Sequence, residues 1–381
     1  MIIKMFGHKR IPSREGGVEV VVGELSTRMA EQGHRVICYN RSGSHDGGIK
    51  PAAGASLKGV SCKSVLTLNK KGLAAVTSSI SAAVCSAFGK ADVVHIHAEG
   101  PAFMCWLPKL FGKRVVVTIH GLDWQREKWK NGFGSRYIRA GEKMAVRFAD
   151  EIIVLSKNVQ QYFEDTYGRK TVWIPNGVCR PQIAEADEIC RQYGLQKNGY
   201  ILYLGRLVPE KGAHYLIEAF RRTNTDKRLV IAGGISDTAE YGERIKTLAE
   251  GDERILFTGF VQGKLLQELC SNAWIFVQPS DLEGMPLTLL EAMSYGNCCL
   301  ISDIPEHTEV AEHYAVTFQK GNMENLREKL QHLCTATQQV EALKAVSADY
   351  ICEKYNWDQV TRKTLELYGV KVNDPSSAVR Q

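Results

Sequence analysis

Two glutamates, Glu283 and Glu291, stand in the chain with seven residues between them, and their carboxylates could accept hydrogen bonds from sugar hydroxyls. The apolar segment 275–278 precedes the first glutamate, which indicates a strand followed by a loop. Pro286 suits the first turn of a helix, so we expect Glu291 to lie inside a helix over 286–295. That helix is otherwise apolar, and a carboxylate in such a setting usually needs a partner.

Backbone groups next to these glutamates could bind an anion or a sugar oxygen. Gly284 and Met285 come directly before the expected helix. A helix start favours anions because its first N–H groups have no partner within the helix. The alternative is that the two glutamates are simply exposed and bind nothing.

A second cluster combines two cations with a strand-to-helix loop. Arg206 and Lys211 lie between an expected strand at 200–204 and an expected helix from 213. An arginine offers a planar fork and a lysine a point charge, which together suit a diphosphate at a helix N-terminus. We expect Gly205 to allow a sharp turn here. By itself, an ordinary charged loop would explain the same residues.

The N-terminal half offers histidines. His120 follows an expected strand at 115–119, and His95 and His97 lie two apart on another strand, so their side chains face the same way. Two histidines at this spacing could bind a metal, but no third ligand is visible nearby in the sequence. Packing or contact with an acceptor is therefore the favoured reading of this pair, and a purely structural role remains the alternative for His120.

The segment after His120 mixes aromatic and charged residues. It includes Asp123 and Arg126 within residues 123–130, where two tryptophans also stand. Such a segment could hold the sugar or phosphate of an acceptor. It could equally cover an edge of the domain.

Short apolar runs alternate with helical patterns along the whole chain, which is typical of α/β proteins with parallel sheets. The expected strands are 36–39, 93–97, 115–119, 152–155, 200–204, 229–232, 255–257, 275–278 and 298–302. The expected helices are 19–32, 74–88, 135–148, 159–167, 213–222, 241–249, 263–271, 286–295 and 357–367.

This rhythm runs twice, which predicts two Rossmann-like domains with ligands bound at the carboxyl ends of their strands, facing a central cleft. We place an N-terminal, acceptor-side domain at 1–179 and a C-terminal, donor-binding domain at 180–355, with a polar linker within 179–197. A helix within 356–372 is expected to return to the N-terminal domain. Residues 373–381 are expected to form a disordered tail.

The composition is typical of a soluble globular protein. The chain has 381 residues, of which 44% are hydrophobic and 24% charged. No apolar stretch is long enough to span a membrane, and the N-terminus lacks the pattern of a signal peptide, so we expect a cytoplasmic location. The eleven cysteines contain no CxxC pair, and we expect them to be reduced.

The formal net charge of +6 is concentrated in residues 101–150, which hold ten basic and four acidic residues. Arg136, Arg139, Lys143 and Arg147 recur at spacings of three and four, which places them on one face of a helix. This face is either simply solvated or binds an anionic membrane surface or acceptor. Nucleic acid is not expected as a partner, because no nucleic-acid-binding module accompanies the basic residues.

These features together resemble the retaining GT-B glycosyltransferases, most closely glycosyltransferase family 4. The resemblance rests on the Glu283–Glu291 spacing with its Gly-Met-Pro insert, on residues 205–212, on Asn176-Gly177 and on Gly16-Gly17. It covers roughly residues 10 to 370. Four motifs in the same order make it specific.

The resemblance implies a role for each matching residue. Arg206 and Lys211 would neutralise the leaving diphosphate, Glu291 would bind the ribose, Glu283 would hold the donor sugar, and His120 would contact that sugar near its anomeric carbon. The implied catalytic residues are His120, Arg206, Lys211 and Glu283. The implied donor-binding residues are Gly16, Gly17, Arg206, Lys211, Glu283, Gly284, Met285, Pro286, Leu287 and Glu291. His97, Asp123 and Arg126 are weaker, acceptor-side candidates.

The expected reaction is transfer of a sugar from a nucleotide-sugar donor to a saccharide or lipid-linked acceptor in cell-surface polysaccharide or glycolipid synthesis. The expected location is the cytoplasm, either in solution or peripheral on the inner face of the membrane. The sequence contains no DxD motif, so we expect neither a divalent metal nor another cofactor. The family implies retention of anomeric configuration. A nucleotide-sugar epimerase of the same fold is the main alternative; an oxidoreductase is disfavoured because no strand is followed by GxGxxG.

Overall fold

A computed structural model describes residues 1–43, 57–70, 72–126, 132–235 and 239–370. The chain divides into two compact units. The first contains residues 1–176 together with the segment from residue 357 to the C-terminus, and the second contains residues 177–356. Each unit is built on one parallel β-sheet covered by helices on both faces, so the predicted pair of Rossmann-like domains is confirmed.

The sheet of the first unit has the strand order β3-β2-β1-β4-β5-β6-β7, and all its described pairings are parallel. This is a doubly wound sheet, in which the order reverses beside the first strand. Its strands are β1 (Ile2–Phe6), β2 (Arg35–Arg41), β3 (Val60–Val65), β4 (Val93–His97), β5 (Arg114–Ile119), β6 (Glu151–Val154) and β7 (Val172–Trp173).

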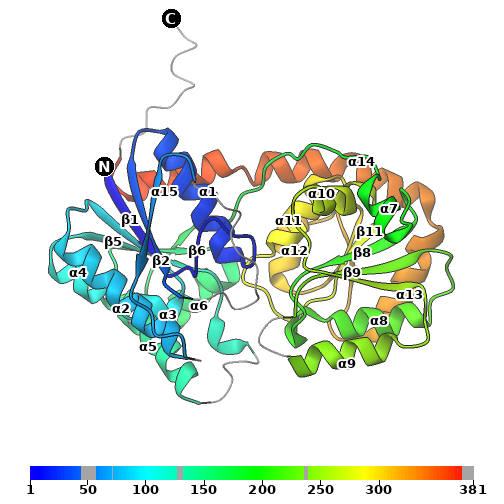
Figure 1. Ribbon diagram of the computed structural model, residues 1–381, viewed down its shortest axis with the longest axis horizontal. Helices are drawn as coiled ribbons and strands as arrows, with labels where there is room; N and C mark the ends of the chain where they lie inside the picture. The colour runs from blue at the N-terminus through cyan, green and yellow to red at the C-terminus, as the bar shows by residue number, and fades with distance from the viewer. Residues whose placement is uncertain (44–56, 71, 127–131, 236–238, 371–381) are drawn as a thin grey trace, which may run out of the picture. The chain divides into compact units, whose positions relative to one another are not determined.

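Two layers of helices cover this sheet. Figure 1 shows α2, α3, α4 and α5 below the sheet of the first unit and α1 and α15 above it. Apolar side chains of the lower layer, such as Ala83 of α2 and Ala145 of α5, form one buried cluster with the strands. The helices are α1 (Gly17–Glu31), α2 (Leu73–Phe88), α3 (Glu99–Ala102), α4 (Trp106–Leu110), α5 (Phe133–Phe148), α6 (Lys157–Tyr167) and α15 (Trp357–Leu367).

The sheet of the second unit has the order β10-β9-β8-β11-β12-β13 and is also parallel. Its strands are β8 (Tyr200–Leu204), β9 (Arg228–Ala232), β10 (Ile255–Gly259), β11 (Ile275–Gln278), β12 (Cys299–Ser302) and β13 (Val316–Phe318). Its helices are α7 (Glu188–Tyr193), α8 (Ala213–Arg221), α9 (Ala239–Ala249), α10 (Gly263–Asn272), α11 (Leu287–Ser294), α12 (Pro305–Ala311), α13 (Met323–Thr335) and α14 (Thr337–Lys354).

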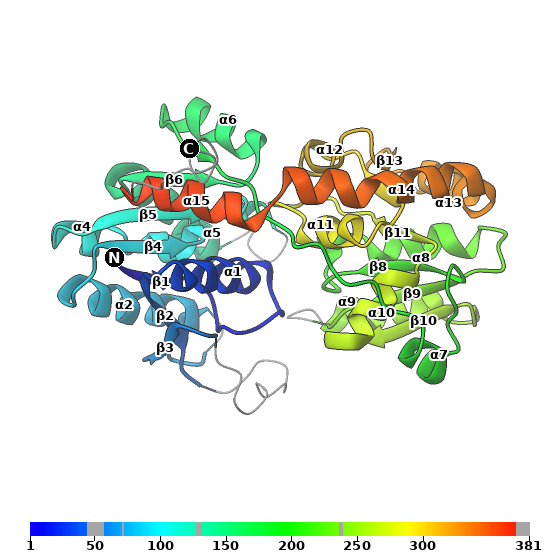
Figure 2. The ribbon, with the colours of Figure 1, turned by 90° about the horizontal axis from the view of Figure 1, so that it is seen from above.

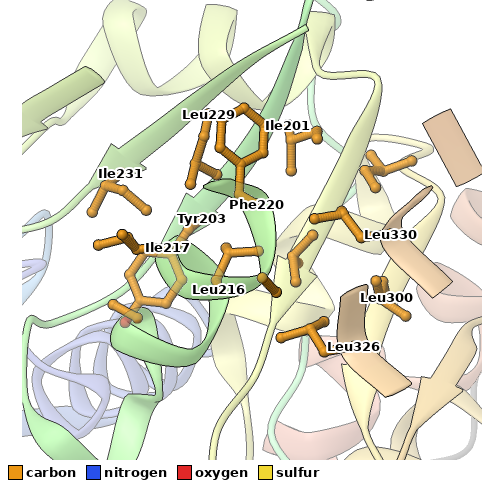
Figure 3. Close-up of a cluster of buried hydrophobic side chains, with 14 of the residues drawn as sticks. Ile201, Tyr203, Leu216, Ile217, Phe220, Leu229, Ile231, Leu300, Leu326 and Leu330 are labelled. Atoms are coloured by element: carbon orange, nitrogen blue, oxygen red, sulfur yellow. The ribbon is translucent and has the colours of Figure 1, made fainter. Parts of the chain in front are cut away.

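A hydrophobic cluster fills each face of the second sheet. Figure 3 shows one of them, in which Leu216 and Phe220 of α8 lie among strand residues such as Leu229, with Leu326 of α13 beside them. Apolar residues that recur every three or four positions along α8 explain why it forms a helix with one buried side. These cores hold the strand ends, and therefore the loops that follow them, in fixed positions.

The C-terminal helix α15 belongs to the first unit, where it packs against α1. Figure 2 shows the two helices side by side. Arg114 Nε donates a hydrogen bond to the carbonyl oxygen of Leu367 over 2.7 Å, and Arg28 Nε lies 3.0 Å from Asp358 Oδ1. The expected helix at 357–367 is therefore present with these bounds.

Each strand and helix predicted from the sequence occurs, with bounds shifted by at most a few residues. The expected linker at 179–197 was wrong: the chain enters the second unit after residue 176, and α7 lies within that segment with Ile189 fully buried. The polar average composition concealed two buried apolar residues, Ile189 and Leu195. The predicted tail at 373–381 lies outside the described residues. Among the described helices, none combines the length and the apolar composition needed to cross a bilayer.

Candidate active site

The carboxylate of Glu283 lies in a dense network at the end of β11. Lys211 Nζ donates to Glu283 Oε1 and Oε2 over 2.5 and 2.6 Å. Gln278 Nε2 and Ser280 Oγ each donate to Oε1 over 2.8 Å. The glutamate side chain is only 6% exposed and that of Lys211 19%. The structure thus joins one residue from each sequence cluster into a single charged pair.

This network keeps Glu283 ionised. Burial alone would raise the pKa of its carboxyl, but the positive charge of Lys211 opposes this, and the hydrogen bonds from Lys211 and Ser280 act in the same direction. Together they lower the pKa of Glu283 to about 2, from an ordinary value of 4.5. The lysine is charge-paired and partly exposed, so a bound anion could still contact it.

His307 of α12 supports the loop after β11 through a hydrogen bond with Ser302. Ser302 Oγ donates to the carbonyl oxygen of Ser280 over 2.5 Å, so its proton is committed. His307 Nδ1 lies 3.0 Å from Ser302 Oγ and 3.1 Å from its carbonyl oxygen, and must therefore carry the proton and donate. Burial lowers the pKa of this histidine to about 4, so it is neutral at pH 7. A chain of hydrogen bonds then runs from His307 through Ser302 and Ser280 to Glu283.

Glycine geometry ties the two strand-end loops together, though not at the expected residue. Gly205 does not have a positive φ; the turn into α8 is made at Gly212, with a φ of +69°. A Cβ atom at Gly212 would lie 2.0 Å from the carbonyl oxygen of Pro279. Any side chain there would therefore separate the loop after β8 from the loop after β11.

The other donor-side candidates lie around this pair. Arg206 is half-buried directly after β8, and its carbonyl oxygen accepts a hydrogen bond from Tyr203. Glu291 lies within α11 and is half-buried. Pro286 caps α11 and does not occupy its first turn: the helix begins at Leu287, one residue later than expected. Gly284 is buried and Met285 half-buried in the loop between β11 and α11.

The histidines of the first unit form a stack behind the end of β5. The rings of His95 and His97 lie 4.1 Å apart, and His97 Nδ1 is 3.1 Å from His120 Nε2. His95 Nδ1 is 2.6 Å from the hydroxyl of Tyr368, and its Nε2 is 2.7 Å from Thr118 Oγ1. Both strand histidines are thus held by packing and hydrogen bonds within the unit.

These rings are neutral at pH 7. Burial lowers the pKa of His95 and His120 to about 3 and that of His97 well below its ordinary value, and the positive charge of Arg126 acts in the same direction on His120. A neutral His120 could exchange hydrogen bonds with a sugar hydroxyl but would not supply a charge. No group of three or more potential metal ligands is assembled within the described ranges.

A buried carboxyl pair positions the segment after His120. Glu99 is fully buried and its Oε2 accepts a hydrogen bond from the backbone N–H of Asp123 over 2.7 Å. Burial raises the pKa of Glu99 well above its ordinary value, and the nearby carboxyl of the equally buried Glu142 adds to this effect. Tyr162 and Tyr167 both donate to Glu142 Oε2, over 3.1 and 2.7 Å.

Asp123 and Arg126 are brought together as an ion pair of 3.1 Å, at the end of the segment that Glu99 fixes. Trp124 beside them lies under the guanidinium of Arg139, 4.2 Å from its ring centre. Residues 127–130 of the segment expected to contact an acceptor lie outside the described residues.

Gly16 caps the N-terminus of α1, which begins at Gly17. A Cβ atom at Gly16 would lie 2.3 Å from Glu19 Oε2. The carboxylate of Glu19 in turn accepts a hydrogen bond from the backbone N–H of Lys9 over 2.7 Å. This glycine therefore makes room for a carboxylate that shapes the loop after β1, a contact that the sequence did not reveal.

Comparison with known proteins decides the family. Residues 15–179 match the model described as Glycosyltransferase Family 4, and residues 185–349 match Glycosyl transferases group 1. The chain belongs to the glycosyltransferases of these two groups. Between them the two models match most of the chain, and they divide it at nearly the point where the structure does.

Curated relatives carry transferase and synthase activities. The chain is 29% identical over 313 residues to D-inositol 3-phosphate glycosyltransferase of Geodermatophilus obscurus, covering 74% of this chain and 69% of that protein. It is 25% identical over 312 residues to alpha-maltose-1-phosphate synthase of Mycolicibacterium smegmatis, covering 73% and 79%. These relatives differ in substrate, so they establish the class of enzyme and no particular sugar.

Solved structures confirm the GT-B fold. Sucrose-phosphate synthase from Thermosynechococcus elongatus matches with a TM-score of 0.81 and 19% identity, covering 97% of this chain and 98% of that one. The Anabaena protein HepE in complex with UDP-glucose matches with a TM-score of 0.80 and 16% identity, covering 97% and 99%. At these identities the similarity shows the fold alone.

Proposed function

We propose that this glycosyltransferase moves a sugar from a nucleoside-diphosphate donor to a saccharide acceptor, with retention of anomeric configuration and without a metal ion. The observation that carries the proposal is the Lys211–Glu283 pair at the end of β11. It places a cation suited to a diphosphate directly against a carboxylate suited to sugar hydroxyls.

In this proposal the charge that develops on the leaving diphosphate is stabilised by Lys211 and Arg206 together with the N-terminus of a helix. Glu283, held ionised by its network, orients the donor sugar through its hydroxyls. Glu291 binds the ribose, and the backbone at Gly284 and Met285 contacts the sugar. Gly16 and Gly17 lie against the phosphates from the first unit.

On the acceptor side, His120 would contact the donor sugar near its anomeric carbon as a neutral hydrogen-bonding group. His97, Asp123 and Arg126 would shape the place of the acceptor. We further propose that this acceptor is lipid-linked and that the protein works at the cytoplasmic face of a membrane in polysaccharide or glycolipid synthesis. A structure described as WaaG, a glycosyltransferase involved in lipopolysaccharide biosynthesis, shares the fold at a TM-score of 0.77.

Transfer is favoured over epimerisation, because the family models and the named relatives are those of transferases and synthases. The four hydrogen bonds that Glu283 accepts from three donors also leave its carboxylate poorly suited to accept a proton from a sugar carbon.

The test measures turnover of a panel of UDP, GDP and TDP sugars in EDTA. No saccharide acceptor is added, so that water slowly accepts the sugar in its place. The proposal expects one of these donors to release its nucleoside diphosphate. Early in the reaction, the anomeric proton signal of the freed sugar should show that the anomeric configuration of the donor is retained. Glu283→Gln should abolish release of the nucleoside diphosphate, whereas Glu243→Gln, which changes an exposed side chain of α9, should not. A sugar nucleotide converted to its epimer, or release that requires added metal, would contradict the proposal.

A further inference from the structure

An apolar ridge runs along the outer side of α2. Leu73, Ile80, Val84 and Phe88 recur at spacings that place them on one side of this helix, and they are 46%, 42%, 41% and 68% exposed. No residue of α2 carries a charge. A helix whose outward side is this apolar is unusual on a protein that is surrounded by water alone.

The ridge continues past the end of α2. The ring of Phe88 lies 4.5 Å from that of Phe111, which is 43% exposed, and neighbouring Leu110 at the end of α4 is 73% exposed. Beside the middle of α2, Leu66 is 74% exposed, and its carbonyl oxygen accepts a hydrogen bond from Ser81 of that helix. Seven of the fourteen large apolar side chains that are exposed in the described part of the chain lie on this surface. They therefore form one continuous patch and are not scattered singly.

Cations border this apolar ridge. Lys63, Lys70 and Lys90 are exposed on the segments that flank α2, and residues 57–91 contain no aspartate or glutamate. Asp92, which follows, accepts a hydrogen bond from the backbone N–H of Ile2. Lys70 and Lys90 thus place positive charge beside the two ends of the helix.

The basic stripe of α5 lies in the same helical layer. Arg136, Arg139, Lys143 and Arg147 are all exposed, as the sequence spacing predicted, while Glu142 of the same helix is buried. α4 packs against both α2 and α5, so the apolar ridge and the basic stripe share one outer side of the first unit (Figure 1).

We infer that this surface, the apolar ridge of α2 and α4 with the basic stripe of α5, binds the interface of an anionic lipid bilayer. Exposed leucine and phenylalanine side chains insert among the acyl chains near the headgroups, and lysine and arginine side chains contact the anionic headgroups. A second copy of the chain is disfavoured as the occupant, because two such surfaces would oppose lysines with no acidic residue to pair with them. The inference rests on the membrane-facing part of the proposed function.

The test is flotation of the full-length protein with phosphatidylcholine vesicles, with and without phosphatidylglycerol. We expect binding only when phosphatidylglycerol is present, and weakening as salt rises. Phe88→Ser with Leu110→Ser should reduce partitioning about tenfold or more, because both apolar side chains lose their burial in lipid. Arg136→Gln with Lys143→Gln and Arg147→Gln should remove the preference for phosphatidylglycerol.

Ile183→Ser with Val346→Ser is the matched control, since these side chains of the second unit are 62% and 43% exposed and the variant should float like the wild type. Absence of wild-type binding to anionic vesicles, or equal loss in the control, would overturn the inference. So would a dimer in solution that Phe88→Ser with Leu110→Ser dissociates. Donor turnover in EDTA, measured on the same variants without vesicles, should be unchanged, which separates failure of this inference from failure of the proposed function.

Discussion

Replacing Lys211 with methionine is the most informative single change in the second unit. The substitution keeps most of the length of the side chain but removes the charge that contacts both oxygens of Glu283. The carboxylate would then remain buried with hydrogen bonds from Gln278 and Ser280 alone. A buried charge that loses its partner is strongly destabilising.

The structure sets the size of this effect. The pKa of Glu283 is lowered from 4.5 to about 2, and a shift of that size corresponds to about 3 kcal/mol of preference for the ionised form. Breaking a buried pair costs about 3–5 kcal/mol, which agrees with this value. The second unit spans residues 177–356, and in a domain of that size each kcal/mol lowers the melting temperature by about 2–4 °C. We therefore expect Lys211→Met to lower it by roughly 6–12 °C.

The pH dependence has a definite sign. Because the folded-state pKa of Glu283 is lowered, its contribution to the free energy of unfolding is complete above about pH 4.5 and is lost as the pH falls toward about 2. The difference in stability between the wild type and Lys211→Met should shrink over that window. Adding Glu283→Gln to Lys211→Met should recover much of the lost stability, because no unpaired charge then remains buried.

The assay is urea and thermal unfolding of the full chain at pH 7 and at lower pH. Lys246→Met is the matched control, because this lysine forms a 3.0 Å pair with Glu243 while their side chains are 52% and 72% exposed. Such a surface pair contributes about 1 kcal/mol or less. If Lys211→Met costs no more stability than Lys246→Met, the reasoning about the buried pair is refuted.

Three further predictions concern buried polar groups. His307→Asn keeps an N–H group near the position of Nδ1, so it should retain turnover of the sugar donor. His307→Gln loses the contact with Ser302 and should reduce turnover about tenfold in steady-state assays, because a lost hydrogen bond costs about 1–2 kcal/mol. Equal activities of the two variants would contradict this prediction. Glu99→Gln should equal or exceed the wild type in unfolding free energy at pH 7, because the raised pKa means that the glutamate already holds a proton beside Glu142. Glu99→Ala should lower the unfolding free energy by about 1–3 kcal/mol. Tyr368→Phe should lower the unfolding free energy by about 1–2 kcal/mol by removing a 2.6 Å hydrogen bond to a buried histidine, and no change in urea midpoint would count against that bond.

The fold could be predicted from the sequence because its strands are buried on both faces and therefore appear as short apolar runs. Four strands, β1, β3, β7 and β13, were not expected. In the central strand β1, Lys4 interrupts the apolar run. Its side chain is nevertheless buried, because Nζ donates to the carbonyl oxygen of Cys85 over 2.6 Å. A long-range partner of this kind leaves no pattern in the local sequence.

The site was predicted in its parts but not in its contacts. Lys211 and Glu283 were both expected to bind the donor, yet their pairing joins residues that are 72 positions apart. Because β8 and β11 are neighbours in the sheet, the loops after these strands meet at one edge. The strand order of a doubly wound sheet could have suggested that contact.

Other residues gave no usable sequence pattern. Glu99 and Glu142 lie on different helices, and a buried carboxyl pair depends on tertiary packing that their local sequences do not encode. His307 stands in a short helix that was not expected. Its importance follows only from its hydrogen bonds to Ser302.

The most direct test of the central claim is calorimetric titration of the full chain with UDP, GDP and TDP in the presence of EDTA, for the wild type and for Glu291→Ala and Lys211→Met. The account predicts that one nucleoside diphosphate binds the wild type without metal, that Glu291→Ala loses most of the affinity, and that Lys211→Met weakens it further than Lys246→Met does. Binding that requires a divalent cation, or that is unchanged in Glu291→Ala and Lys211→Met, would contradict the assignment of the donor site to the second unit.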